Sequence, residues 1–515
     1  MNLAALLDRA GRSARERPAV TLGSRVLWSY GELAERAARL AGGLRRRYGL
    51  GDGARVLIAM KNHPAYVELL FACWRAGLAA VPVNAKLHAK EFRYILGHSG
   101  AQAVFVTPDL EATLAEAAKD AKGVREIVDV DSRAYRRLPD GEPAGMAEVG
   151  ADDLAWLFYT SGTTGRPKGA VLTHRNLMAM TLSYFADVDT VTPGDSILHA
   201  APMSHGSGLY TLPHVAGFAT QAVPESGGFD PAEIFGLLPD LHGVAMFAAP
   251  TMVKRLIDHP QAADADVGHL KTIVYGGGPM YVADLKRAMQ RFGQRFVQIY
   301  GQGESPMTIT ALSRSDHMAK DHPRHEARLG SVGRAQTVVA VRVADEADAT
   351  LPPGEPGEVL VRGDSVMPGY WQNPEASAET LRGGWLHTGD VGAMDADGYL
   401  TLMDRSKDVI ISGGANIYPR EIEEVLLADD RVQECAVVGR PHPEWGEEVV
   451  AFVVPRPGAQ PTREELDRLC LAEMARFKRP REWRFVEALA KNEAGKILKT
   501  ALREQLAEER DAGGG

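Results

Sequence analysis

A segment rich in hydroxyl groups and glycine surrounds one lysine between residues 159 and 169. It reads Tyr159-Thr-Ser-Gly-Thr-Thr-Gly-Arg-Pro-Lys168-Gly169 and continues an apolar run, LAWLFY. Hydroxyl donors, backbone N–H groups exposed at glycine and a cation are the groups that bind polyphosphate. No G-x-x-x-x-G-K-[ST] pattern can be drawn through the segment, so it is not a Walker A loop. The pattern predicts a phosphate-binding loop of another kind, with a flexible surface turn as the alternative.

Further short motifs follow in order along the chain. They are Tyr275-Gly-Gly-Gly-Pro279, Tyr300-Gly-Gln-Gly-Glu304, Trp385-Leu-His-Thr-Gly-Asp390, Asp404-Arg-Ser-Lys-Asp408, Gly413-Gly414, Tyr418-Pro-Arg-Glu421 and Asn492-Glu-Ala-Gly-Lys496. Each alone is ordinary, because a lone charge is usually a solvated surface residue. Together they resemble the adenylate-forming superfamily, which includes acyl-CoA synthetases, aryl-CoA ligases, peptide-synthetase adenylation domains and firefly-type luciferases. The resemblance covers nearly the whole chain.

The resemblance implies an ATP-dependent activation of a carboxylic acid. The carboxylate attacks the α-phosphorus of ATP and releases pyrophosphate, and the acyl group of the resulting acyl-adenylate then passes to CoA with release of AMP. The enzyme must neutralise phosphate charge and align the acid with the leaving group. The implied ATP/AMP-binding residues are Thr160, Ser161, Gly162, Thr163, Thr164, Gly165, Lys168, Gly276, Gly277, Gly278, Pro279, Tyr300, Gly301, Gln302, Gly303, Asp390, Arg405 and Lys496.

The same resemblance gives individual roles to some of these residues. Asp390 would accept hydrogen bonds from the ribose hydroxyls, with Arg405 beside it, and Tyr300 would stack on adenine. Glu304 would ligate Mg²⁺. Lys496, which would reach both the carboxylate and the α-phosphate, is expected to be catalytic together with His205 and Glu304. Lys407 falls at the hinge about which the small domain of the family swings.

The acid and CoA sites are also implied by the resemblance. The acid site would draw on His205, Gly206, Ser207, Gly208, Met246, Phe247, Gly277 and Met307. No acidic residue occurs in 203–210, so recognition of an α-ammonium group is disfavoured and an apolar or aromatic acid is expected. CoA would contact Gly413, Gly414, Trp445, Phe477, Arg479 and Arg481, although the basic residues among them could equally form a solvated face. One departure from the family is Gly303, where threonine is usual.

Helices alternate with strands in the first part of the chain. Ser29 and Glu32 predict a capped helix, and apolar runs at 54–60, 79–83, 101–107 and 125–130, with a helical segment at 65–77, predict α/β layers around a largely parallel sheet. Segments 131–153 and 313–328 are predicted to be loops.

The character of the chain changes near residue 405. The alternating runs VQECAVVG and EEVVAFVV, a helix opened by Thr462 and Glu465, and a last helix predict a small α+β domain. We therefore expect an α/β protein with a large multi-subdomain N-terminal domain, 1–406, holding the ATP and acid sites. A small mobile C-terminal domain, 407–510, would carry the catalytic lysine, and 511–515 would be a disordered tail.

Composition limits the remaining possibilities. The 515 residues include 58 Lys and Arg against 67 Asp and Glu, a net charge of −9, which disfavours a general nucleic-acid binder. Cys73, Cys435 and Cys470 form no C-x-x-C pair, which excludes a disulfide framework or a thiolate zinc site. Neither a signal peptide nor an apolar run of about 18 residues is evident, so we expect a cytoplasmic monomer or homodimer without stable membrane insertion.

Three alternatives to a CoA ligase stay open at this point. An adenylating ligase could pass the acyl group to an amine or to a separate carrier protein. A luciferase-like oxygenase and a non-catalytic nucleotide-binding protein are less favoured, the second because both Lys168 and Lys496 are present. The identity of the acid is not fixed by the sequence.

Overall fold

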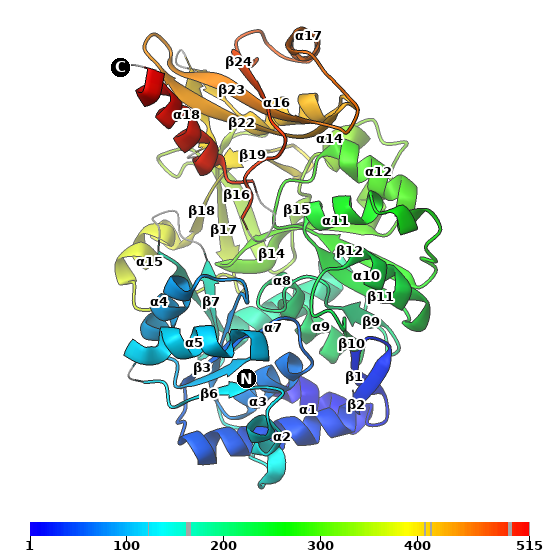
Figure 1. Ribbon diagram of the computed structural model, residues 1–515, viewed down its shortest axis with the longest axis vertical. Helices are drawn as coiled ribbons and strands as arrows, with labels where there is room; N and C mark the ends of the chain where they lie inside the picture. Colours follow the sequence, from blue (N-terminus) through cyan, green and yellow to red (C-terminus); the bar gives the residue numbers. More distant parts are fainter. Residues whose placement is uncertain (122, 161–165, 406–407, 413–414, 493–496, 514–515) are drawn as a thin grey trace.

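Four sheets organise the described residues, three in the larger first part of the chain and one in its last part (Figure 1). The computed structural model describes residues 1–121, 123–160, 166–405, 408–412, 415–492 and 497–513, with the side chains of all of these except 405 and 510–513. An α/β large domain with mixed sheets and a smaller C-terminal domain confirm the expected fold class.

The first sheet has six strands in the order β6–β5–β3–β4–β7–β8, and only the β7–β8 hairpin is antiparallel. Val56 and Ile58 belong to one apolar cluster and Leu57 and Ala59 to another, so β3 is covered on both faces. This burial explains the continuous apolar runs in the sequence. The strands are β3 (Arg55–Ala59), β4 (Ala79–Val83), β5 (Ala103–Val106), β6 (Glu126–Asp129), β7 (Leu154–Thr160) and β8 (Lys168–Thr173).

Helices of the N-terminal region cover this sheet and the edge of the next. The predicted capping box is confirmed, because Ser29 and Glu32 cap the second helix reciprocally, and that helix ends at Gly49 in the left-handed conformation (φ 54°). The helices are α1 (Ala4–Ser13), α2 (Tyr30–Tyr48), α3 (Ala65–Arg75), α4 (Ala89–Ser99), α5 (Glu111–Ala117) and α6 (Arg133–Arg136).

The second sheet has nine strands in the order β15–β14–β13–β12–β11–β9–β10–β1–β2, and its six central strands, from β13 to β1, are parallel. The strands are β1 (Pro18–Leu22), β2 (Arg25–Ser29), β9 (Ser196–Leu198), β10 (Thr220–Val223), β11 (Val244–Ala248), β12 (Leu270–Tyr275), β13 (Phe296–Gln302), β14 (Ser305–Leu312) and β15 (Arg334–Ala335). Its helices are α7 (His174–Ser183), α8 (Gly206–Leu209), α9 (Thr211–Ala216), α10 (Pro231–Leu237), α11 (Pro250–Ile257), α12 (Val282–Phe292), α13 (Arg314–Met318) and α14 (His325–Leu329).

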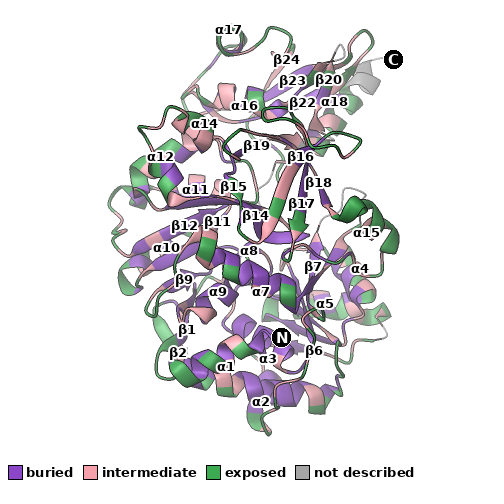
Figure 2. Cartoon of the chain, turned by 180° about the vertical axis from the view of Figure 1, so that it is seen from behind, coloured by how far each residue is buried: buried purple, intermediate pink, exposed green. Residues whose placement is uncertain are grey.

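The third sheet is antiparallel and has the order β16–β17–β18–β19. Its strands are β16 (Val339–Ala344), β17 (Gly357–Gly363), β18 (Leu386–Met394) and β19 (Leu400–Arg405), and α15 (Pro374–Thr380) lies between β17 and β18 in sequence. Figure 2 shows α15 largely exposed.

The chain changes to the fourth sheet between Arg405 and Ile410, where the domain boundary is predicted. Its strands are β20 (Ile410–Ser412), β21 (Ala415–Ile417), β22 (Val432–His442), β23 (Gly446–Pro455) and β24 (Glu482–Phe485). The helices are α16 (Pro419–Leu427), α17 (Arg463–Glu473) and α18 (Lys499–Gly513). Thr462 and Glu465 form the predicted capping box of α17.

Three sequence expectations about irregular segments differ from the structure. Within 131–153, Ser132 caps the short helix α6, and within 313–328, Ser313 and Asp316 form a capping box that opens α13. Local caps therefore make short helices where charge and proline predicted only loops. The backbone of the predicted disordered tail, 511–515, is helical as far as Gly513.

Candidate active site

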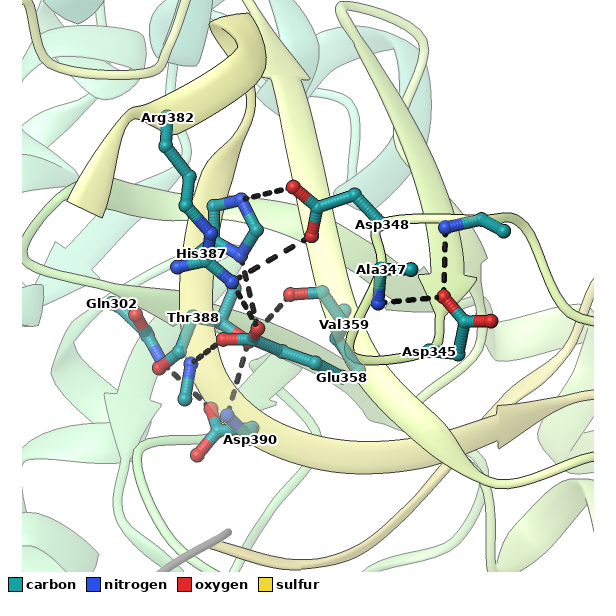
Figure 3. Close-up of polar contacts among 12 residues, drawn as sticks. Gln302, Asp345, Ala347, Asp348, Glu358, Val359, Arg382, His387, Thr388 and Asp390 are labelled. Carbon is teal, nitrogen blue, oxygen red and sulfur yellow. Dashed lines mark hydrogen bonds and ion pairs between the residues drawn. The ribbon is translucent and has the colours of Figure 1, made fainter. Parts of the chain in front are cut away.

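The turn between β13 and β14 carries the first group of predicted nucleotide-binding residues. The Tyr300 hydroxyl donates to Asp390 Oδ2 at 2.6 Å. Gln302 Nε2 donates to the same oxygen at 2.6 Å, and Figure 3 shows Gln302 beside Asp390. Gln302 Nε2 also donates to the Thr388 carbonyl at 3.0 Å. Asp390 is 7% exposed. The structure thus brings together three residues from motifs about 90 positions apart.

Glu358, on β17, holds the residues that precede Asp390. Glu358 Oε1 accepts the Gly389 N–H at 3.0 Å, and Glu358 Oε2 lies 2.9 Å from His387 Nδ1. Figure 3 shows Glu358 and His387 facing each other. Gly389 has a φ of 68°, which favours glycine at this turn. Sequence reasoning missed Glu358, because no motif includes it and its contacts are made across strands.

The second group of residues lies at the other end of the same turn. Glu304, which is 9% exposed, accepts a hydrogen bond from the Tyr370 hydroxyl at 2.6 Å. Lys168 Nζ lies 5.1 Å from the centroid of the Tyr370 ring. Burial, with the charge of Glu304, raises the pKa of Tyr370, so this phenol stays protonated and donates. Tyr370 therefore links the predicted metal ligand to the predicted phosphate-binding lysine, and sequence reasoning missed it.

A pocket of about 170 Å³ adjoins Lys168. Its walls include a second cation, Arg166, and the aromatic side chains of Tyr94, His98, Tyr370 and Trp371. The pocket places two positive charges beside the start of β8. A net positive, partly enclosed surface of this kind suits phosphate oxygens.

Several predicted glycines allow close packing between these elements. A Cβ at Gly303 would lie 2.3 Å from Thr160 Cγ2, one at Gly276 would lie 2.5 Å from the Ile299 carbonyl oxygen, and one at Gly301 would lie 2.6 Å from the Met307 backbone nitrogen. The departure at Gly303 thus has a physical reason, since Thr160 occupies the space that a threonine side chain would need. In contrast, Gly278 has ordinary room, and Gly277 is distinguished by its φ of 80°.

His205 stands where β7 approaches the predicted acid site. Its ring packs edge-on against Phe158, with centroids 5.3 Å apart, and its Nδ1 is hydrogen-bonded to Ser204 Oγ at 2.8 Å. Burial lowers the pKa of His205 to about 4, so the imidazole is neutral at pH 7. A neutral imidazole beside Phe158 suits the entrance of an apolar binding site.

Three residues predicted for the acid site, Gly206, Phe247 and Met307, lie together, and we call them the acid-site wall. A Cβ at Gly206 would lie 2.9 Å from Phe247 Cε1 and 3.2 Å from Met307 Cε, so any side chain there would intrude between them. Met307 has a φ of 60°, a left-handed conformation that is uncommon outside glycine and is often found at functional sites.

Other residues predicted for the acid site do not join this wall. Met246 alternates with Phe247 along β11 and packs in the cluster on the opposite face of the sheet, with Leu256 and Ile273. Ser207 Oγ is hydrogen-bonded to His199 Nδ1 at 2.8 Å, and a Cβ at Gly208 would lie only 1.7 Å from the Met203 carbonyl oxygen. Packing thus accounts for these three residues, because strand alternation and the tight α8 turn decide where they lie.

Two buried tyrosines extend the aromatic cluster behind Phe247. Tyr210 packs edge-on against Phe247 and Tyr184, with centroids 6.2 and 4.8 Å apart. Within the described residues, the hydroxyls of Tyr184 and Tyr210 have no hydrogen-bond partner. A buried hydroxyl without a partner costs free energy and is uncommon in folded proteins.

Three of the predicted CoA-binding residues have partners within the small domain. The Trp445 ring stacks on His442, with centroids 4.2 Å apart, and the Arg481 guanidinium lies 4.9 Å from the Trp445 ring. Arg479 forms an ion pair with Asp467, whereas Phe477 is 47% exposed. Arg481 and Trp445 thus lie side by side, and Arg479 is turned toward α17.

Some predicted residues lie outside the described part of the chain: Ser161, Gly162, Thr163, Thr164, Gly165, Lys407, Gly413, Gly414 and Lys496. The backbone of Arg405 is described and pairs with Asp390 across β18 and β19. Within the described ranges, no three His, Cys, Asp or Glu side chains gather into a metal site. Glu304 alone still fits Mg²⁺, which proteins often hold by one or two carboxylates together with substrate phosphates. Among the described helices, none has both the length and the apolar character to cross a membrane.

Comparisons with known proteins identify the family. A family model described as AMP-binding enzyme matches residues 7–371, and one described as AMP-binding enzyme C-terminal domain matches residues 421–496. A feruloyl-CoA synthase of Amycolatopsis sp is 39% identical over 96% of this chain and 97% of its own length.

Two solved structures superpose over 98% of this chain and 99% of their own. ATP-bound MatB of Rhodopseudomonas palustris is 32% identical with a TM-score of 0.88, and the amide bond synthetase McbA of Marinactinospora thermotolerans is 29% identical with a TM-score of 0.88. The apo form of MatB, at the same 32% identity and with 98% and 99% coverage, gives a TM-score of 0.81. The overall arrangement is therefore nearer to the ATP-bound form.

Proposed function

This chain belongs to the AMP-binding enzymes of the adenylate-forming superfamily and is an AMP-forming acid–thiol ligase; from this premise we propose that it joins an aromatic or apolar carboxylic acid to CoA. The observation that carries the proposal is the turn from Tyr300 to Glu304. At one end of the turn, Tyr300 and Gln302 hold Asp390, and at the other, Glu304 meets Tyr370 beside Lys168. One short turn thus joins a candidate ribose site to a candidate phosphate site.

The first half-reaction needs the acid and the triphosphate aligned. Asp390 would accept from the ribose hydroxyls, and Thr160 and Lys168 would hold the β- and γ-phosphates. Glu304 would hold Mg²⁺, which when bound neutralises phosphate charge as pyrophosphate leaves. Lys496 would stabilise the negative charge shared by the attacking carboxylate and the α-phosphate. In the second half-reaction the CoA thiol attacks the acyl carbonyl, and AMP leaves.

The apolar part of the acid would lie against Gly206, Phe247 and Met307. An aromatic acid is supported by these side chains and by the similarity to the feruloyl-CoA synthase. The Tyr210 ring packs against Phe247 and the Tyr184 ring against Tyr210, and within the described residues the buried hydroxyls of both tyrosines have no hydrogen-bond partner. A phenolic hydroxyl at the far end of the acid would supply the partner that they lack, and a site built for a hydroxyl disfavours the analogue without one.

A panel of acids tests this proposal. We expect pyrophosphate release with CoA to be about tenfold more efficient for a phenolic aryl acid than for its deoxy analogue. Tyr210→Phe should reduce that preference, whereas Tyr66→Phe, which removes a buried hydroxyl from α3, should leave it unchanged. The measurement is kcat/KM for each acid pair, followed by identification of the acyl product.

The outcomes of the panel separate the candidate functions. Absence of pyrophosphate release with every acid would refute an acid-activating enzyme. Release without thioester, but with amide formed from a mixture of amines, would replace CoA by an amine, the alternative favoured by the similarity to McbA. An equal kcat/KM for phenolic and deoxy acids would contradict only the proposed role of the tyrosine hydroxyls and would leave the acid-activating function intact.

Tyr370 provides a separate prediction for the metal end of the site. Tyr370→Phe removes the hydrogen bond that orients Glu304, so we expect a roughly tenfold lower rate of adenylation and a higher Mg²⁺ concentration at half-maximal rate. The measurement is a Mg²⁺ titration of pyrophosphate exchange. Tyr94→Phe, a change in the same pocket at a ring that stacks on His98, is the matched control. An unaltered Mg²⁺ dependence in Tyr370→Phe would contradict this role.

A further inference from the structure

Two adjacent glutamates of α16 connect the small domain to the large one. Glu423 Oε2 accepts the Tyr281 hydroxyl at 2.9 Å, and Glu424 Oε2 accepts the Val282 N–H at 3.3 Å. Val282 begins α12, whose own N-cap residue, Tyr281, makes no capping bond through its side chain. Glu424 therefore satisfies an N–H at the positive end of a helix in the other domain. Figures 1 and 2 both show α16 above α12.

Glu423 also binds two elements of its own domain. It is 2% exposed, and its Oε1 accepts the Val437 N–H at 2.8 Å and lies 3.0 Å from Lys499 Nζ. One buried carboxylate thus contacts the large domain, β22 and α18. A charge buried to this extent is tolerated only where its partners surround it, so loss of one partner is costly.

Lys499 extends the contact toward the predicted hinge. Its Nζ lies 3.2 Å from Asp404 Oδ2, on β19, the last strand before the chain changes to the small domain. Burial opposes the charge of Lys499, but the carboxylates of Glu423 and Asp404 outweigh it and raise the pKa of the lysine. The ammonium form, which both carboxylates need, is therefore the one present at neutral pH.

Lys499 lies close in sequence to the predicted catalytic lysine. Lys499 is the first residue of α18, three positions beyond Lys496. A residue tied to both Glu423 and Asp404 restrains the chain on either side of it. Lys499, which follows the Lys496 segment in the sequence, is thus anchored to the strand that precedes the small domain.

We propose that Tyr281, Glu423, Lys499 and Asp404 form a latch that positions the Lys496 segment for the first half-reaction and opens for the second. The proposal rests on the proposed function. Tyr281 belongs to the large domain and Glu423 to the small one, so a swing of the small domain breaks their hydrogen bond. The arrangement that contains the latch matches ATP-bound MatB (TM-score 0.88) more closely than apo MatB (0.81), which supports its link to the nucleotide-bound step.

Tyr281→Phe tests the latch with the smaller change, because it removes one hydroxyl and leaves Glu423 its contacts with Val437 and Lys499. Lys499→Met breaks the latch from the other side. We expect acid-dependent pyrophosphate exchange to fall about tenfold in Tyr281→Phe and further in Lys499→Met. Thioester formation from preformed acyl-adenylate should be unchanged or faster, and Lys499→Arg should recover most of the exchange activity.

Two control variants make the same chemical changes elsewhere. Tyr66→Phe removes a buried hydroxyl from α3, and Arg431→Met breaks ion pairs of 2.8 Å with Asp429 and Glu465 inside the small domain. Both should retain exchange and thioester formation at wild-type rates.

Separate measurements of the two half-reactions test whether the latch exists. Equal loss in both half-reactions would reduce Tyr281 and Lys499 to ordinary structural residues, and wild-type exchange in Tyr281→Phe and Lys499→Met would overturn the latch. If the wild-type protein performs no exchange with any acid, the failure lies with the proposed function and not with the latch.

Discussion

Lys496→Ala is expected to lower the rate of acyl-adenylate formation by roughly 10²–10³, while thioester formation from preformed acyl-adenylate is much less affected. The reason is electrostatic. Negative charge concentrates between the attacking carboxylate and the α-phosphate only in the first half-reaction, and a fixed ammonium group lowers the energy of that transition state. In the second half-reaction the acyl carbonyl reacts with a thiol, and this lysine is not needed at the reacting atoms.

Acid-dependent pyrophosphate exchange and single-turnover thioester formation measure the two half-reactions independently. Lys491→Ala is the matched control, since Lys491 precedes the same segment and its ammonium pairs with Glu434 at 2.6 Å. The control should retain both activities. Similar losses in the two half-reactions of Lys496→Ala would show that the lysine does not act selectively in adenylation.

Motif order placed Tyr300, Gln302 and Asp390 in one candidate site. These residues contact one another although they come from different motifs, because β13 and β18 bring their ends together. Short motifs preserve the backbone features that chemistry needs, such as the positive φ at Gly389. Such features are local, so they are visible in the sequence.

The supporting residues could not be predicted in the same way. Tyr370 contacts Glu304 across 66 positions, and Glu358 contacts Gly389 across 31. Asn62, which is buried, donates to the carbonyls of His199 and Ala201 at 2.6 and 2.9 Å and so fixes the chain just before His205. None of these residues belongs to a local pattern. Their roles arise only when distant elements pack together.

Strand alternation contains information that the acid-site prediction did not use. Met246 and Phe247 are neighbours in β11, and neighbours in a strand face opposite sides of the sheet. Only one of the two could line the same wall, and the structure places Phe247 there. Alternation of buried and exposed residues along a strand is a local property of the sequence. It predicted the strands of the small domain, and it also separates Met246 from Phe247. The antiparallel sheet β16–β19 was not anticipated as a separate layer, because its pairings are set by tertiary contact.

A fall in stability on mild acidification is the second large effect that we expect. Burial holds the pKa of five histidines far below the ordinary value of 6.5: about 4 for His174, His199, His205 and His317, and about 3 for His214. In the unfolded chain these imidazoles are protonated below about pH 6.5, whereas in the folded chain they stay neutral down to about pH 4. Their contribution to the free energy of unfolding is therefore fully present above pH 6.5 and is lost as the pH falls toward 4. Each such proton changes the free energy of unfolding by about 1.4 kcal/mol per pH unit.

The window between pH 6.5 and 5 isolates this effect, since ordinary carboxylates titrate lower. We expect the midpoint of thermal unfolding to drop steeply across it at constant ionic strength, and unfolding at pH 5.5 to take up several protons. Calorimetry in buffers of different ionisation enthalpy measures that uptake directly. His199→Gln should reduce it by about one proton, because His199 is buried between Ser207 and Gln221. A midpoint that stays flat from pH 7.5 to 5, or an uptake of less than about one proton, would show that these rings already titrate normally in the folded chain.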